Sequence, residues 1–101
     1  MINFFENTKF LPSDEEIKIV FENDEIRIER ICSNNCPSGP YFQDNDEWVM
    51  ILDGEAILEM NGENIDLSKG DSIFIPRKTV HSVLGTSKNC IWIAIHIKVK
   101  K

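Results

Sequence analysis

The chain has 101 residues, the size of one domain, and 42% of them are hydrophobic, which is enough to bury a core. Its formal net charge of -6 argues against binding to nucleic acid or to an anionic membrane surface, because both require clustered lysine and arginine. The lack of a long apolar run, and of a signal-peptide pattern at the N-terminus, leads us to expect a cytoplasmic protein.

The three cysteines are odd in number, and Cys32, Cys36 and Cys90 do not show the CxxC spacing of a redox or zinc motif. We therefore expect reduced thiols with a structural role, as is usual in the cytoplasm. A disulfide or a metal-bound thiol is the alternative.

In chain order, residues 1–15 are expected to form an N-terminal arm with little regular structure, and residues 16–101 a single β domain. Polar and apolar residues that alternate between turn signals predict eight strands, over residues 17–21, 26–31, 47–52, 55–60, 63–67, 72–75, 81–84 and 90–99. Residues 33–40 are rich in Asn, Cys, Pro and Gly and are expected to be a loop. Asp53-Gly54 and Asn61-Gly62 are hairpin signals, so the strands around them are predicted to form a meander.

No stretch has convincing helical periodicity, and many short strands separated by glycine turns predict an all-β sandwich or a closed barrel. The last predicted strand has two different faces. Alternate residues from Ile91 to Ile97 are all isoleucine, while Trp92, Ala94 and His96 fall on the opposite face. The isoleucine face could be either core or a dimer interface, and the strand pattern alone does not decide between them.

Two segments hold the most informative spacing. Glu47 is followed by six residues and then Gly54, and Gly70 is followed by five residues, Pro76 and later His81. This order and spacing resemble the two signature motifs of the cupin family, with a resemblance that covers residues 26–98. The resemblance implies a jelly-roll barrel, also called a double-stranded β-helix, with a pocket inside it.

In metal-binding cupins, the first motif supplies two histidines and a glutamate, and the second motif supplies a histidine. Carried over by position, this chain keeps Glu47 and His81, while Tyr41 and Gln43 stand where the two other histidines would be. First-row divalent ions favour imidazole and carboxylate, whereas an amide oxygen is a weak donor and a phenol must ionise to bind strongly. The glycine that usually follows the proline of the second motif is Lys78 here.

The candidate site follows from these positions. Glu47 and His81 are the expected catalytic pair, although Glu47 could instead lie in water at a strand end and His81 could be structural. The candidate metal ligands are Gln43, Glu47, His81 and, if its strand face points inward, His96. The candidate ligand-binding residues are Tyr41, Gln43, Arg77 and Trp92.

Two functions remain open. The first is a cupin that binds a small polar molecule through an unusual divalent-metal site (Zn, Fe, Mn or Ni) and that could act as a dioxygenase, isomerase or lyase. The second is a metal-independent metabolite-binding module without catalytic activity. A homodimer is expected in either case, because residues 48–52 and 91–97 carry more apolar residues than one small barrel interior needs.

Overall fold

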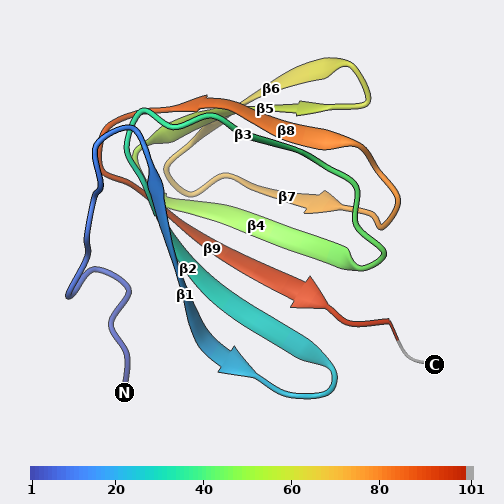
Figure 1. Ribbon diagram of the computed structural model, residues 1–101, viewed down its shortest axis with the longest axis horizontal. Coiled ribbons are helices and arrows are strands. Elements are labelled where there is room, and N and C mark those ends of the chain that lie inside the picture. The colour runs from blue at the N-terminus through green and yellow to red at the C-terminus, as the bar shows by residue number, and fades with distance from the viewer. Residues whose placement is uncertain (100–101) are drawn as a thin grey trace.

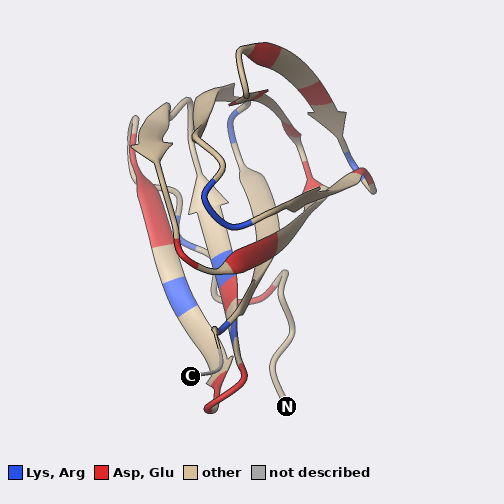
Figure 2. Ribbon diagram, turned by 90° about the vertical axis from the view of Figure 1, so that its right-hand side faces the viewer, with Lys and Arg blue, Asp and Glu red and all other residues tan. Residues whose placement is uncertain are grey.

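The computed structural model describes residues 1–99, which form nine β-strands and contain no helix (Figure 1). The strands are β1 Glu15–Glu22, β2 Ile26–Ser33, β3 Ser38–Tyr41, β4 Asp46–Asp53, β5 Glu55–Met60, β6 Glu63–Ser68, β7 Ser72–Ile75, β8 His81–Thr86 and β9 Cys90–Ile97. Among these residues, no helix could cross a membrane. Figure 2 shows Lys and Arg scattered among more numerous Asp and Glu, in keeping with the negative net charge.

The strands build two antiparallel sheets that face each other. One sheet has the order β1-β2-β9-β4-β7 and the other has the order β3-β8-β5-β6. In Figure 1 the four-stranded sheet lies across the top and the five-stranded sheet fans out beneath it. The predicted all-β jelly-roll fold is therefore confirmed. Each sheet turns one apolar face toward the other, and the space between them contains both the core and the candidate site.

Alternation along the central strands places their side chains. In β4, Glu47, Val49 and Ile51 are buried while the residues between them are partly exposed. In β9, Trp92 and His96 lie on the buried inner face. The inner face of β9 is thus the one that carries Trp92 and His96, a point that the strand pattern left open. The core cluster consists of Val49, Ile51, Ala56, Leu58, Leu67, Ile75, Cys90, Trp92 and Ala94.

One of the two predicted hairpins is wrong. β4 pairs with β7 and β9, and β5 pairs with β6 and β8, so Asp53-Gly54 carries the chain from one sheet to the other. Gly54 has φ of +86°, and a Cβ there would lie 2.7 Å from Ser87 Oγ, so this crossing needs glycine. The other hairpin is confirmed: Asn61 and Gly62 have φ of 52° and 80°, as a type I′ turn requires.

The expected loop over residues 33–40 is also partly wrong, because β3 begins inside it. Ser38 pairs with Val83 and Tyr41 pairs with His81 of β8. β3 is an edge strand, where Pro40 can be accommodated because one side of the strand needs no backbone donor. The pairing brings Tyr41 beside His81, with ring centroids 5.5 Å apart.

The N-terminal segment is held against the sheet by a buried arginine. Arg30 is 2% exposed, and its guanidinium donates hydrogen bonds to the backbone oxygens of Glu6 (2.7 Å) and Asn7 (3.1 Å). β1 begins at Glu15, the last residue of the expected arm. The charged bonds from Arg30 therefore fix part of the segment that precedes β1.

Cys32, Cys36 and Cys90 are buried free thiols, as expected. Burial raises the pKa of the Cys90 thiol to about 12, with smaller contributions from nearby negative charge. This cysteine therefore acts as a small apolar side chain at neutral pH.

Candidate functional site

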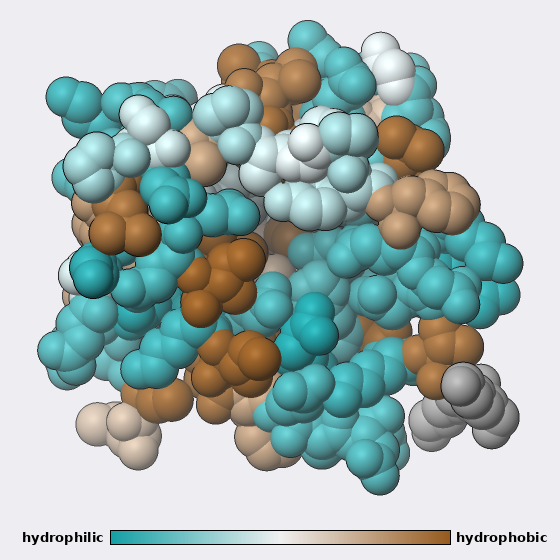
Figure 3. Space-filling view, viewed as in Figure 1, coloured by the Kyte–Doolittle hydropathy of each residue, from teal (hydrophilic) through white to brown (hydrophobic). Residues whose placement is uncertain are grey.

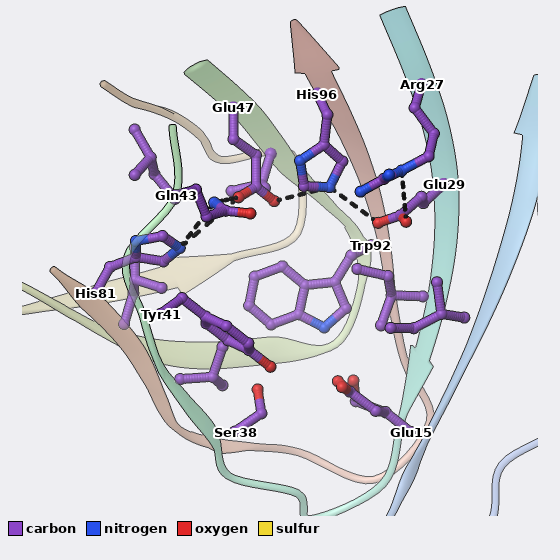
Figure 4. A pocket seen from close by; sticks show the side chains of 17 residues that line it. Glu15, Arg27, Glu29, Ser38, Tyr41, Gln43, Glu47, His81, Trp92 and His96 are labelled. Atoms are coloured by element: carbon purple, nitrogen blue, oxygen red, sulfur yellow. Dashed lines mark hydrogen bonds and ion pairs between the residues drawn. The ribbon is translucent and has the colours of Figure 1, made fainter. Parts of the chain in front are cut away.

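A cavity of about 220 Å³ lies inside the barrel. Its lining comes from both sheets, and it includes six of the seven predicted site residues: Tyr41, Gln43, Glu47, His81, Trp92 and His96 (Figure 4). Arg77 is the exception, since it is exposed and does not line the cavity. In the space-filling view, a hollow lies near the centre of the face shown, with hydrophobic side chains gathered beside it over β1 (Figure 3).

Gln43 lies between the two residues retained from the cupin motifs. Its Nε2 donates to Glu47 Oε1 at 2.8 Å and lies 3.4 Å from His81 Nε2. His81 Nδ1 is 2.9 Å from the backbone oxygen of Thr79, which can only accept, so Nδ1 carries the proton. The lone pair on His81 Nε2 therefore faces the cavity, 3.7 Å from Glu47 Oε1.

Both ring nitrogens of His96 form hydrogen bonds. Asn45 Nδ2 donates to its Nδ1 at 3.1 Å, and its Nε2 donates to Glu29 Oε1 at 3.0 Å. His96 Nε2 is also 3.7 Å from Glu47 Oε2. Figure 4 shows the result as one row of polar side chains, from Arg27 at one end to His81 at the other.

Glu29 joins this row from β2. Its Oε2 is 3.1 Å from Arg27 Nε, an ion pair without hydrogen-bond geometry. The pKa of the Glu29 carboxyl lies below its ordinary value, mainly because His96 donates a hydrogen bond to it, while burial opposes the shift. The carboxylate is therefore ionised at neutral pH, although its side chain is only 10% exposed.

The loops at this end are tied together through the backbone. Lys78 N donates to Gln43 O at 2.6 Å, and Arg77 N donates to Asp46 Oδ1 at 2.8 Å. Lys78 has φ of +60°, the left-handed conformation for which the cupin motif ordinarily uses glycine. These bonds hold the loop that carries Gln43 against the loop that carries Arg77, whose side chain does not line the cavity.

Several lining residues were missed from the sequence: Glu15, Glu29, Ser33 and Ser38. Arg27 also lines the cavity. Strand parity was the available signal, because Arg27 and Glu29 lie on the same face of β2 as Ile31. Knowing that this face points inward required the pairing of Arg27 with His96 across β2 and β9.

The side chains present do not form the metal site that the resemblance implies. Within residues 1–99, no group of three or more His, Cys, Asp and Glu residues is placed to hold a metal ion. His96 Nε2 donates to Glu29, so His96 would have to give up this buried hydrogen bond to bind a metal. Glu47 and His81 would be joined by the neutral Gln43 oxygen alone, whereas Zn, Fe and Ni sites favour further imidazoles or thiolates.

The comparisons with known proteins agree with this fold. The family model described as the cupin domain matches residues 36–96, so the chain belongs to the cupin family. Cupins often bind metals, but the match itself does not assign one here. No curated protein sequence matches the chain.

Solved structures show the same architecture over nearly the whole chain. A proposed mannose-6-phosphate isomerase from Ralstonia eutropha has 30% sequence identity and a TM-score of 0.90, with 98% of each chain covered. KdgF from a Halomonas species has 19% identity and a TM-score of 0.82, covering 98% of this chain and 94% of its own. A cupin superfamily protein from Desulfitobacterium hafniense has 16% identity and a TM-score of 0.83, covering 91% and 84%. The last two show the fold alone.

Proposed function

We propose that this cupin binds a small polar molecule in the barrel cavity through its own side chains, without a bound metal. The observation that carries the proposal is the lining itself. A row of hydrogen-bonding groups runs along one wall, while Val49, Leu58 and Ile75 contribute apolar surface to the same cavity. Cavities of this kind recognise small ligands, with apolar contact giving affinity and a few placed polar groups giving orientation.

Gln43 explains why a metal is not needed to organise this wall. Its amide N–H groups point at two acceptors, Glu47 Oε1 and His81 Nε2, where a cation would otherwise be required. A ligand hydroxyl can donate to the same two acceptors, or accept from the Gln43 amide. The site is therefore built to exchange hydrogen bonds with a neutral polar group.

Glu47 and His81 are also the groups that could act chemically on a bound molecule. His81 Nε2 is an acceptor held in one tautomer by Thr79, and the His81 and Glu47 side chains are both buried, at 5% and 8% exposed. Such a pair could move a proton within a substrate, as an isomerase or lyase requires. The likeness to a proposed mannose-6-phosphate isomerase supports a small polyhydroxylated molecule as the class of ligand.

The second candidate is a metal-dependent dioxygenase, isomerase or lyase. One observation favours it: His81 donates Nδ1–H to a backbone carbonyl, an arrangement that is usual for histidines that ligate metals. In that case Glu47, His81 and the Gln43 oxygen would hold the ion.

The test is a thermal-shift screen of sugars, polyols, amino acids and small organic acids, run with and without EDTA. A ligand at a hundred times its Kd adds about 2.7 kcal/mol to the unfolding free energy. We expect at least one compound to raise the melting temperature equally in EDTA, and His81→Ala to abolish the rise. Arg77→Ala is the control, since Arg77 lies outside the cavity and should leave the rise unchanged. If every shift vanished in EDTA, the metal-dependent candidate would replace this proposal.

We also propose a homodimer. An apolar row crosses the outer face of the five-stranded sheet, because Ile28 pairs with Ile95, Ile95 with Trp48, and Trp48 with Phe74. Phe74 is 48% exposed, so this row can be covered by a second copy of the chain. Light scattering should give twice the chain mass for the wild type and a lower mass for Phe74→Lys; a monomeric wild type would contradict the dimer.

Three free thiols suit the reducing cytoplasm, where we propose that the protein acts.

A further inference from the structure

We infer that the cavity has a second polar subsite, formed by Trp92, Ser38, Tyr41 and Glu15, which receives a hydroxyl group of an uncharged polyhydroxylated ligand and rejects a phosphorylated one. The inference rests on the proposed function, because it specifies the ligand of the same cavity. It concerns the part of the lining that the Glu47–His81 row does not use.

The indole N–H of Trp92 is the first observation. Trp92 is 4% exposed and lines the cavity, and its Nε1 has no hydrogen-bond partner among residues 1–99. Figure 4 shows this nitrogen on the side of the ring that is turned toward Glu15 and Ser38, away from Glu47 and His81. A buried donor without an acceptor is destabilising, so a ligand oxygen placed here would remove that cost.

Three further polar groups lie in the same part of the cavity. The Ser38 hydroxyl, the Tyr41 hydroxyl and the Glu15 carboxyl make no side-chain hydrogen bond to any residue that the structure describes, although all three residues line the cavity. Together with Trp92, they offer both donors and acceptors to a single incoming group. A hydroxyl matches such a set, because it donates and accepts at once.

The charges of the lining decide between neutral and anionic ligands. Within the described part of the chain, the cavity is lined by three carboxyl groups, those of Glu15, Glu29 and Glu47, and by one guanidinium, that of Arg27. Arg27 is already paired with Glu29 at 3.1 Å. A phosphate would therefore meet carboxylates without a free cation.

The partly buried surroundings of Glu15 favour a neutral ligand group over an anion. The pKa of Glu15 is raised, first by burial and then by the nearby charges of Asp14 and Glu29. The Glu15 carboxyl oxygens can accept a hydrogen bond from a ligand hydroxyl at this place. The volume of about 220 Å³ is below the common range of about 300–1,000 Å³ for drug-sized sites, which limits the ligand to a single sugar ring or a short polyol.

The experiment compares mannose, glucose and mannitol with mannose 6-phosphate in calorimetric titrations of the full chain in EDTA. We expect the neutral compounds to bind and the phosphorylated one not to bind. Trp92→Phe keeps an aromatic ring but removes the N–H, and we expect it to weaken neutral binding about threefold to tenfold, the value of one hydrogen bond. Glu15→Gln should admit the phosphorylated sugar, and Arg77→Ala should behave as the wild type.

Nuclear magnetic resonance keeps the inference testable if Trp92→Phe fails to fold. The chain has two tryptophans, Trp48 and Trp92, and so two indole N–H signals, which Trp48→Phe assigns. Added mannitol should shift the Trp92 signal and leave the Trp48 signal in place. Equal or tighter binding of mannose 6-phosphate, or neutral binding with an unmoved Trp92 signal, overturns the subsite and leaves the proposed function standing. If none of the four compounds binds, the subsite is also overturned, while the proposed function fails only if no compound of the wider metabolite screen binds in EDTA.

Discussion

Glu29→Gln tests whether the buried interactions of Glu29 with His96 and Arg27 stabilise the fold. Glu29 accepts from His96 with Oε1 and faces Arg27 with Oε2. Glutamine has one acceptor oxygen, so its amide group would face either the His96 N–H or the Arg27 guanidinium. Leaving a buried donor unpaired costs about 1–3 kcal/mol. In a domain of this size that lowers the melting temperature by roughly 5–20 °C.

The same substitution has a predictable pH dependence. The pKa of Glu29 is lowered from its ordinary value of 4.5, chiefly by the His96 hydrogen bond. Because the folded pKa is lower than the unfolded one, the stabilisation is present above 4.5 and is lost as the pH falls through the folded value. Wild type and Glu29→Gln should therefore converge in stability at acid pH, where Glu29 is protonated and resembles glutamine.

The assay is urea unfolding at pH 7 and at several values below 4.5. Glu22→Gln is the matched control, since Glu22 pairs with Lys98 at 2.8 Å but on the exposed side of the sheet. We expect no measurable change in the unfolding free energy of Glu22→Gln. The reasoning is refuted if Glu29→Gln behaves like Glu22→Gln at pH 7, or if its deficit persists undiminished in acid.

Three further predictions follow from single positions. The unfolding free energy should fall by about 1.4 kcal/mol per pH unit between pH 9 and 12, because the raised pKa keeps the buried Cys90 thiol protonated while the unfolded chain releases that proton. In urea unfolding, the free energy of Cys90→Ala should fall less steeply with pH than that of the wild type, and an equal dependence on pH would contradict this prediction. Gly54→Ala should destabilise more than Gly62→Ala, by about 1–3 kcal/mol, because both have positive φ but only Gly54 meets neighbouring atoms; equal melting temperatures would be inconsistent with this. The double substitution Tyr41→His and Gln43→His should raise bound zinc to about one ion per chain by elemental analysis, since it supplies the missing imidazoles; an unchanged metal content would show that the positions are misassigned.

Strand alternation and turn residues predicted much of the fold. The strands over Glu55–Met60 and Ser72–Ile75 end where they were predicted, because both lie between clear turn signals. The Asp53-Gly54 turn was misread because a hairpin and a crossing between sheets use the same residue types, and only long-range pairing separates them. β3 was missed because the local preference of Pro and Gly for loops is overridden when an edge strand finds a partner.

The candidate site was predictable where a motif named the residue. Glu47, His81 and Gln43 were found from spacing, and the structure brings them within hydrogen-bonding or ion-pair distance of one another. Glu29 was not found, since its role depends on the register of β2 against β9, which a single sequence does not state. Arg77 was predicted to bind the ligand but lies outside the cavity, because proximity along the chain does not fix the direction of a side chain in a loop.

The most direct test of the account is a calorimetric titration of the best ligand from the screen, repeated after exhaustive treatment with EDTA. The account predicts the same Kd in both experiments, and its loss in His81→Ala but not in Arg77→Ala. Binding that disappears with EDTA and returns with about one equivalent of Zn, Mn, Fe or Ni would contradict it, and would make Glu47 and His81 metal ligands.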